Sequence, residues 1–151
     1  MPKIDVNTDY DQRVRSSFAR QKAMETIGAQ LTSVTPGTIE IEMPYSAALT
    51  QQHGFIHAGI ISTALDSACG YAAYSLMPPE AAVLTIEFKL NMLAPGKGER
   101  FLFRGNVTKP GRTIIVADGQ AYAFSADGEA KLIATMTATM MTITGRDGLA
   151  G

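Results

Sequence analysis

The sequence predicts an α+β protein in which a curved antiparallel sheet of about five to six strands wraps around one long central helix, with an additional N-terminal helix. Three observations carry this prediction. A run from about Ala58 to Leu76 is apolar on nearly every side, which is typical of a helix enclosed by other structure. Two strand-like runs precede it and four follow it. Short turn sequences between the strands favour hairpins, and hence antiparallel pairing.

The first elements are a helix and a hairpin. Between residues 9 and 27, apolar side chains recur at near-helical spacing among Arg, Lys and Gln, and Gly28 supplies a stop. Residues 29–35 and 38–45 flank a Pro36-Gly37 turn, and the second run alternates isoleucine or methionine with glutamate. We therefore expect an amphipathic helix, which could form a lid or a cap, followed by two paired strands.

After the central helix, which ends at Pro78-Pro79, the chain predicts only strands. Their ranges are 83–93, 100–109, 113–124 and 130–143. The reversal signals between them are Ala94-Pro95-Gly96, Pro110-Gly111 and Asp127-Gly128.

Alternation within residues 83–93 predicts that the apolar side chains share one face and that Thr85 lies on the opposite face with the polar ones. The apolar residues are Leu84, Ile86, Phe88, Leu90 and Met92, and the polar companions of Thr85 are Glu87, Lys89 and Asn91. A half-exposed, strand-favouring threonine is therefore one interpretation of Thr85.

Length and composition predict one domain over residues 1–151, with a helix at 9–27, a core at 28–144 and a disordered tail at 145–151. Thirteen basic and fourteen acidic residues give a net charge of −1, without the basic run that a nucleic-acid partner requires. No apolar run reaches the ~18–20 residues of a membrane-spanning helix, and the polar start lacks the apolar core of a signal peptide. With its single cysteine, Cys69, the chain is expected to be cytoplasmic, with no membrane partner.

The segment Gln51–Tyr71 carries the candidate chemistry, because a loop with glycine and histidine runs into an apolar helix that holds one carboxylate, Asp66. Burying an unpaired ionised carboxyl group is costly, so Asp66 must be paired with donors, be protonated, or line a cavity that admits water and ligand. The third option suits acyl transfer, and a structural carboxylate that caps buried groups is the alternative. Two histidines and one cysteine do not build a metal site, and we expect no metal or cofactor.

These residues resemble the hotdog-fold thioesterases, specifically the PaaI-like, phenylacetate-degradation type. That family has an Asn, a Gly and then His-Gly-Gly at the start of the central helix, with an Asp nine residues after the His. The matching positions here are Gln51, Gly54, His57-Ala58-Gly59 and Asp66. Gln51 replaces the Asn, and Ala58 replaces the first Gly of the pair while keeping its backbone N–H. The resemblance covers about Gly28 to Ile143 and implies a hotdog fold and hydrolysis of an acyl-CoA thioester.

The chemistry of thioester hydrolysis gives these residues expected roles. Asp66 would be the general base or the nucleophile, and the sequence does not choose between the two. The amides of Ala58 and Gly59, at the N-terminus of the helix, would stabilise the oxyanion. His57 would orient the loop or contact the substrate. From the resemblance, Thr85 matches a Ser or Thr of the strand that follows the helix.

Eight residues separate Ala58 from Asp66, which is ~12 Å along a helix. One thioester cannot touch both, so we expect a dimer with antiparallel central helices and two equivalent composite sites. The resemblance places Gln51, His57 and Ala58 of one subunit against Asp66 and Thr85 of the other. It also makes further pairing, into a dimer of dimers, usual.

The remaining candidates concern substrate binding and the competing functions. Gly54, Phe55 and Ile56 are expected near the acyl group, whose class (aryl, short-chain or medium-chain) stays open. Lys109 and Arg112 flank a turn and could meet the phosphates of CoA, with a solvated turn as the alternative. Two other functions remain: a hydratase or dehydratase of the same fold acting on enoyl or 3-hydroxyacyl thioesters, and a non-catalytic acyl-CoA-binding protein, of which the glutamine at position 51 would be a sign.

Overall fold

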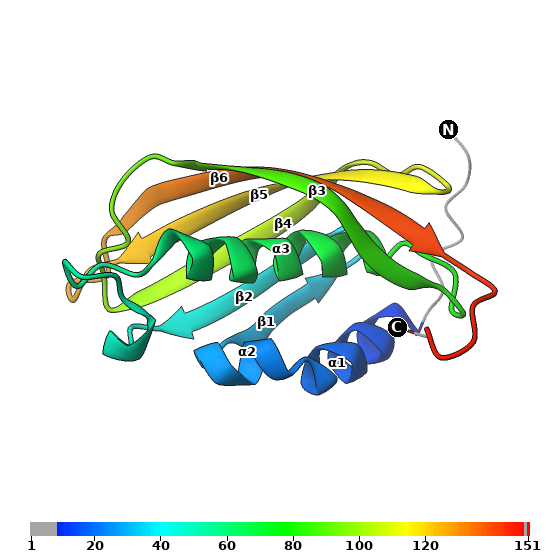
Figure 1. Cartoon of the computed structure of the whole chain (residues 1–151), viewed down its shortest axis with the longest axis horizontal. Coiled ribbons are helices and arrows are strands. Elements are labelled where there is room, and N and C mark those ends of the chain that lie inside the picture. The colour runs from blue at the N-terminus through cyan, green and yellow to red at the C-terminus, as the bar shows by residue number, and fades with distance from the viewer. Residues whose placement is uncertain (1–8, 150) are drawn as a thin grey trace.

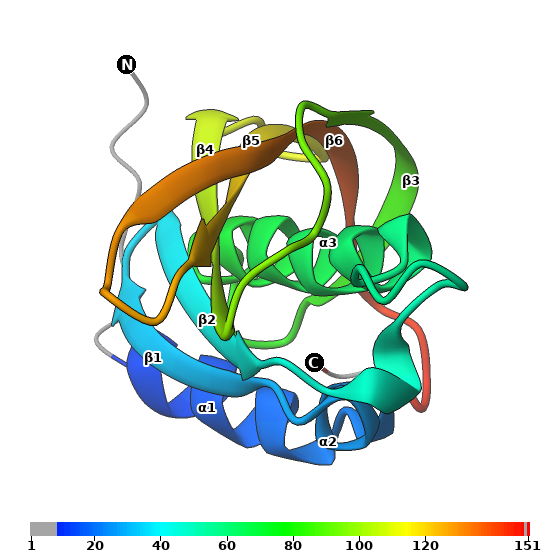
Figure 2. The same cartoon turned by 90° about the vertical axis from the view of Figure 1, so that its left-hand side faces the viewer.

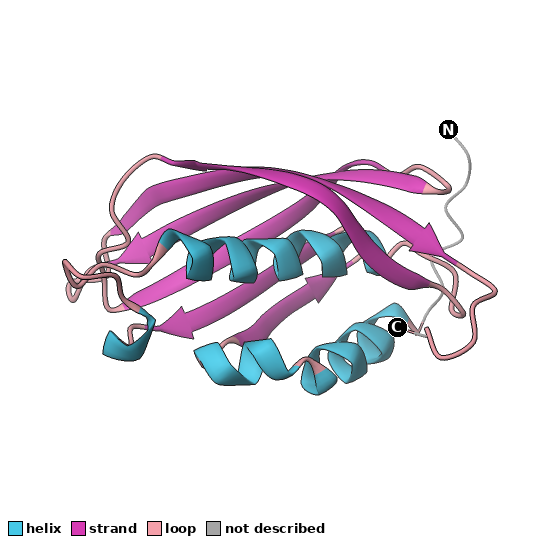
Figure 3. Ribbon diagram, in the orientation of Figure 1, coloured by secondary structure: helices cyan, strands magenta, loops and turns pink. Residues whose placement is uncertain are grey.

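One sheet curves around a central helix, as the computed structural model of residues 9–149 and 151 shows (Figures 1 and 3). The helices are α1 (Tyr10–Arg20), α2 (Lys22–Ile27), a short 3-10 helix (Ala47–Leu49) and α3 (Ala58–Tyr74). The strands are β1 (Gln30–Thr35), β2 (Thr38–Pro44), β3 (Ala82–Met92), β4 (Arg100–Lys109), β5 (Ile114–Phe124) and β6 (Ala130–Ile143). All pairs are antiparallel, in the order β1-β2-β4-β5-β6-β3. The predicted fold class is confirmed.

The helix predicted over residues 9–27 is divided at Gln21, whose extended backbone (φ −81°, ψ 98°) separates α1 from α2. Six residues separate Phe18 from Met24, so a continuous helix would turn Met24 ~120° away from Phe18. The break returns Met24 and Ile27 to the core, where both are buried. Both helices lie beside β1, below α3 in the view of Figure 2.

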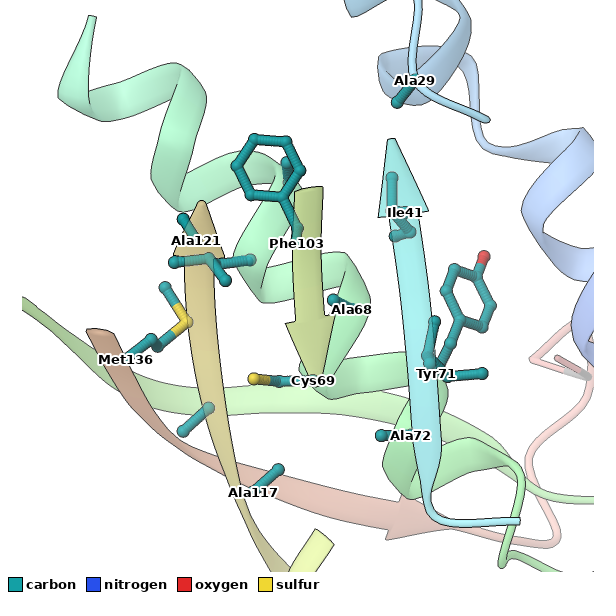
Figure 4. Packing of buried hydrophobic residues seen from close by; sticks show 14 of the residues in the cluster. Ala29, Ile41, Ala68, Cys69, Tyr71, Ala72, Phe103, Ala117, Ala121 and Met136 are labelled. Atoms are coloured by element: carbon teal, nitrogen blue, oxygen red, sulfur yellow. The ribbon is translucent and has the colours of Figure 1, made fainter. Parts of the chain in front are cut away.

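Close backbone contact fixes α3 against β4 and β5. A Cβ atom on Gly105 of β4 would lie 2.3 Å from the carbonyl oxygen of Ala68, and one on Gly119 of β5 would lie 3.0 Å from Sγ of Cys69. Glycine is therefore required at Gly105 if α3 is to lie this close to the sheet, and at Gly119 a larger residue would force the Cys69 side chain to shift. Figure 4 shows Ala68 and Cys69 of α3 beside the strands that carry Phe103 and Ala117, and all four residues are buried.

The faces of β3 differ from the predicted alternation because Ile86 forms a bulge, where the pairing of β3 with β6 shifts by one residue between Thr85 and Glu87. A one-residue slip turns the following side chains to the other face. Thr85 pairs with the buried Met140 on the α3 side, and Glu87 pairs with Thr139 on the outer side.

The prediction that Thr85 shares a face with Glu87, Lys89 and Asn91 is therefore wrong. The single apolar face predicted for this strand is likewise divided, since Leu84 pairs opposite Met141 and Phe88 pairs opposite Ala138.

The turn Ala94-Pro95-Gly96 does not form the predicted hairpin. β3 is the edge strand beside β6, whereas β4 lies between β2 and β5, so the chain crosses between them. The crossing segment instead lies against the loop before α3, where the Ile56 N–H donates to the Gly96 carbonyl oxygen at 2.9 Å. The turns at Pro110-Gly111 and Asp127-Gly128 do join paired strands, as predicted.

The ends of the chain bear on two predictions. The first eight residues of the predicted domain and Ala150 of the predicted tail lie outside the described residues. Of the tail, Gly148, Leu149 and Gly151 lie near α1 and α3, and its disorder stays a prediction. Within residues 9–149 and 151, no helix is long and apolar enough to cross a membrane.

Candidate active site

Asp66 lies in the middle of α3, and its side chain reaches β3. Thr85 Oγ1 donates a hydrogen bond to Asp66 Oδ1 at 2.8 Å. Burial raises the pKa of the Asp66 carboxyl group above its ordinary value, and the hydrogen bond from Thr85 opposes part of this shift. The carboxylate therefore has one donor on one oxygen and is held in a partly desolvated environment.

A cavity of about 280 Å³ lies beside Asp66, and we call it the Asp66 cavity. Its walls come from α3, from α1 and the break after it, from β3 and from the tail. The lining residues are Asp66, Ser67, Gly70 and Tyr71; Ser17 and Gln21; Ala82, Val83, Leu84 and Thr85; and Gly148, Leu149 and Gly151. Ser17 of α1 and Gln21, which follows α1, thus contribute one wall of this cavity.

The start of α3 is organised by His57, its N-cap residue. His57 Nδ1 accepts a hydrogen bond from the Gly59 N–H at 2.8 Å, and a Cβ atom on Gly59 would lie only 2.9 Å from that nitrogen. The Gly59 amide is therefore engaged in the cap. The Ala58 N–H makes no hydrogen bond within residues 9–149 and 151, so of the two amides predicted for an oxyanion hole it is the open one.

Gln51 holds the loop before α3 together. Its Oε1 accepts hydrogen bonds from the His53 N–H at 2.6 Å and the Phe55 N–H at 3.3 Å. Gly54 sits in the same turn with φ 81°, a conformation that favours glycine. The glutamine at the family's Asn position therefore bonds to its own loop, and its amide nitrogen has no partner in the described part of the chain.

A second cavity, of about 480 Å³, lies at the start of α3, and we call it the His57 cavity. It is lined by Gln51, Gln52, Phe55, Ile56, His57 and Ala58 and by Met92, Leu93, Ala94, Pro95 and Gly96. The residues of the predicted site are thus divided: Asp66 and Thr85 line one cavity, and the loop and the Ala58 amide line the other. One chain does not bring the two halves together.

Other candidates lie apart from both cavities. Lys109 and Arg112 are exposed at the β4–β5 turn and line neither. Burial raises the pKa of the Cys69 thiol to about 12, which keeps it protonated and unreactive. No group of three or more His, Cys, Asp or Glu among the residues described here is arranged to hold a metal ion.

Ser17, Gln21, Ser67 and Gly70 are among the lining residues of the Asp66 cavity that the sequence analysis did not identify as site residues. Gly70 follows Asp66 by four residues, which places the two on the same side of a helix, whereas Ser67, one residue after Asp66, lies ~100° further round. The four-residue spacing from Asp66 is therefore a sequence signal for Gly70. Ser17 and Gln21 reach the cavity through the packing of α1 against α3, and nothing local in the sequence marks them.

Comparison with known proteins identifies the family. The profile of the Thioesterase superfamily matches residues 53–127, which include α3, β3, β4 and β5. The crystal structure of a thioesterase family protein from Silicibacter pomeroyi is 64% identical, with a TM-score of 0.88, over 90% of this chain and 99% of that chain. The chain belongs to the thioesterase superfamily. The prediction of a thioester hydrolase is thereby confirmed at the level of the reaction class.

More distant solved structures share the fold of this thioesterase. The E. coli PaaI protein from the phenylacetic acid degradation operon is 18% identical, with a TM-score of 0.81, over 93% of this chain and 98% of that chain. A thioesterase from Haemophilus influenzae is 19% identical, with a TM-score of 0.75, over 85% of this chain and 87% of that chain. The predicted hotdog fold is confirmed.

Proposed function

We propose that this thioesterase hydrolyses acyl-CoA thioesters to a carboxylate and CoA, and that Asp66 activates the attack. The observation that carries the proposal is the setting of Asp66. No cation pairs with it in the described chain, it lines a cavity, and burial raises the pKa of its carboxyl group. A raised pKa makes the carboxylate a stronger base, and Oδ2 is left for water or substrate because Thr85 bonds to Oδ1.

The reaction has two possible courses that share an ionised Asp66. As a base, Asp66 takes a proton from water while the water oxygen bonds to the thioester carbon, and the carbonyl electrons move onto oxygen. As a nucleophile, its own oxygen bonds to that carbon, and water later hydrolyses the anhydride. In the general-base course, the C–S bond breaks as the tetrahedral intermediate collapses, and the CoA sulfur takes the proton from Asp66. In the nucleophile course, the C–S bond breaks as the anhydride forms, and the CoA thiolate takes the proton that water gives up when it hydrolyses the anhydride. The Ala58 N–H would stabilise the oxyanion.

A composite site in a two-fold dimer reconciles this chemistry with the two separate cavities. Asp66 and the Ala58 amide are ~12 Å apart along α3, which is too far for one thioester. We propose that the His57 cavity of one subunit joins the Asp66 cavity of the other, giving two equivalent sites. The edge strand β3 supports this arrangement, because its apolar side chains are exposed in the single chain, which favours pairing with another strand. They are Leu84, Ile86, Phe88 and Met92.

Release of free CoA thiol from a panel of aryl- and alkyl-CoA thioesters tests the reaction. We expect the wild type to release thiol and Asp66→Asn to lose turnover by several orders of magnitude, because an amide cannot take the proton. Asp127→Asn, in an exposed turn away from both cavities, is the matched control and keeps turnover. Acyl-CoA binding without thiol release would indicate a binding protein instead. Hydration of an enoyl-CoA without thiol release would indicate a hydratase.

Ala58→Pro tests the oxyanion amide with little structural disturbance. Proline is favoured at the first position of a helix, and the preceding His57 has the extended backbone (φ −59°, ψ 135°) that proline requires. The variant lacks only the N–H, so we expect kcat to fall about 10²–10³-fold. An unchanged kcat would remove Ala58 from the site.

Mixing the two inactive variants tests the composite site. After subunit exchange, a dimer of one Ala58→Pro chain and one Asp66→Asn chain has one site intact and one doubly impaired. Half of the dimers are mixed, so about a quarter of the wild-type activity should return. If each site lay within one chain, no activity would return.

A further inference from the structure

We propose that Met140, a buried methionine of β6, is a positioning residue for the reaction. Its sulfur accepts the hydroxyl proton of Thr85 whenever Asp66 is protonated, and this second partner for Thr85 favours the protonated carboxyl group. Met140 is fully buried and does not line the Asp66 cavity, so it acts through Thr85 and not on the substrate. The exchange of hydrogen bonds rests on geometry alone, whereas its effect on the rate rests on the proposed function.

The sulfur atom of Met140 lies within reach of the hydroxyl group that contacts Asp66. Met140 is the residue directly opposite Thr85 where β6 pairs with β3. Thr85 Oγ1 is 2.8 Å from Asp66 Oδ1 and 3.4 Å from Met140 Sδ. Met140 also reaches toward α3, since its Cε atom would lie 4.0 Å from a Cβ atom on Gly70. The methionine therefore packs between β6, β3 and α3, with its sulfur beside the Thr85 hydroxyl group.

The hydroxyl group of Thr85 has a single proton, which it can donate fully to only one of these two neighbours. Ionised Asp66 is the stronger acceptor, because a hydrogen bond to a charged group is roughly twice as strong as one between neutral groups. The thioether sulfur of methionine is a weak acceptor. While Asp66 is ionised, the proton of Thr85 therefore lies in the bond to Oδ1, and Met140 Sδ receives none.

Protonation of Asp66 reverses the direction of the first hydrogen bond. A carboxyl group with its proton on Oδ1 donates to Thr85 Oγ1, whose lone pairs can accept it. The proton of Thr85 then turns to Met140 Sδ, which gives a chain of two hydrogen bonds from Asp66 through Thr85 to Met140. Because the bond to sulfur forms only in the protonated state, it stabilises that state and makes the carboxylate a stronger base.

The titratable and charged groups around Asp66 are uncharged or already paired. They are the Cys69 thiol and the Tyr71 hydroxyl of α3, Arg20 of α1, Asp118 of β5 and, in the proposed dimer, the partner's His57. Burial raises the pKa of Cys69 to about 12 and raises that of Tyr71, so both stay neutral where a carboxyl group titrates. Arg20 donates to backbone carbonyl oxygens, and Asp118 accepts from Thr108. The side chains that α1, β3 and the tail contribute to the cavity wall carry no charge.

Titration of the Asp66 carboxyl group tests the exchange without any need for activity. The carbon-13 chemical shift of Asp66 Cγ reports its protonation, and Asp66→Asn assigns the signal. Met140→Leu keeps an apolar side chain of similar volume and removes the sulfur. We expect it to lower the midpoint pH of the titration by about half a pH unit, as for one weak neutral hydrogen bond. Met136→Leu, the same change at another buried position of β6 (Figure 4), is the matched control and should leave the midpoint in place.

A double-mutant cycle tests whether Met140 acts through Thr85. Thr85→Val removes the hydroxyl group, so in that background Met140→Leu should not move the midpoint any further. A midpoint in Met140→Leu equal to that of the wild type would overturn the inference. A shift of undiminished size in the Thr85→Val background would overturn it as well, because the sulfur would then act on Asp66 without the hydroxyl group.

The rate of thiol release should follow the titration. In Met140→Leu the acidic limb of kcat/KM against pH should move to lower pH by the same amount, which is opposite to the effect of removing the Thr85 donor. A limb that stays in place while the titration moves would overturn the role of Met140 in the reaction. If the wild type releases thiol from no acyl-CoA, the proposed function is rejected, and the titration still decides whether the hydrogen bonds exchange.

Discussion

Burial of the Asp66 side chain favours the protonated carboxyl group in the folded protein, whereas the proposed reaction uses the ionised carboxylate. Because its pKa is raised in the folded state, the folded protein holds the proton more tightly than the unfolded chain does. The contribution of this group to stability is therefore full below the ordinary carboxyl pKa and is lost as the pH rises through the raised pKa. The proposed mechanism needs the ionised form of Asp66, in which this group contributes less to stability.

Asp66→Asn should therefore raise Tm at neutral pH while it abolishes turnover. The amide oxygen can still accept the hydrogen bond from Thr85, and no charge is desolvated. Thermal unfolding at pH 7 and at a pH below the ordinary carboxyl pKa would show the gain at pH 7 only. In the control, Asp127→Asn, hydrogen bonding lowers the pKa of the wild-type carboxyl group, so the sign is opposite and no gain is expected. A lower Tm for Asp66→Asn at pH 7 would contradict this account.

Thr85 tunes the same group through its hydrogen bond. In the wild type, kcat/KM should fall as the pH drops through the raised pKa of Asp66. Thr85→Val removes the donor that lowers this pKa, so the acidic limb of the pH–rate profile should move to higher pH, and Thr85→Ser should restore it. Thr137→Val, on an exposed part of β6, should leave the profile in place. Coincident limbs in the wild type and Thr85→Val would show that this bond does not act on the reacting group.

The N-cap of α3, in which His57 accepts a hydrogen bond from the Gly59 N–H, is expected to stabilise the folded protein measurably. His57→Ala removes the acceptor for the Gly59 N–H and should lower the free energy of unfolding by about 1 kcal/mol, whereas asparagine, a good N-cap, should restore most of it. Denaturant unfolding measures both. His53→Ala is the control, because this loop histidine is exposed and only its backbone N–H bonds to Gln51. Equal losses for His57→Ala and His57→Asn would mean that the cap contributes little.

The elements also show where sequence reasoning succeeds and where it fails. Strand positions and the central helix were predictable because alternation and apolarity are local properties. The face of Thr85 was not, because the bulge at Ile86 arises from pairing with β6, some fifty residues later in the chain. The hairpin predicted at residues 94–96 failed for the same reason, since strand order is not local. The break at Gln21 did have a signal, the six-residue interval from Phe18 to Met24.

In the candidate site too, the residues that local sequence patterns indicate differ from those that only tertiary packing brings in. His57, Ala58 and Asp66 lie on one continuous segment, so their spacing could be interpreted directly. Ser17 and Gln21 join them only through the packing of α1 against α3, where Phe18 and Tyr71 have ring centroids 5.9 Å apart. No pattern within residues 9–27 distinguishes a cavity wall from an ordinary amphipathic face.

At the scale of the whole molecule, assembly and activity should be lost together. Phe88→Lys places a charge in the middle of the β3 edge strand, where Phe88 is 41% exposed in the single chain. We expect a folded monomer by sedimentation velocity and circular dichroism, without thiol release. Ile114→Lys, at a position also 41% exposed but on β5, is the control and should remain an active dimer. A folded, active Phe88→Lys monomer would refute the composite site.

The two sides of α3 differ in how much space separates the helix from its neighbours. Toward the sheet, a Cβ atom on Gly105 would collide with the backbone of α3 at Ala68 and Cys69, and one on Gly119 would press on the Cys69 and Leu65 side chains. Toward the Asp66 cavity, Gly70 meets nothing within ordinary contact distance except one flexible methionine. A substitution on the cavity side can therefore reshape the cavity while the helix stays in place, whereas a side chain at Gly105 cannot be added without moving the helix.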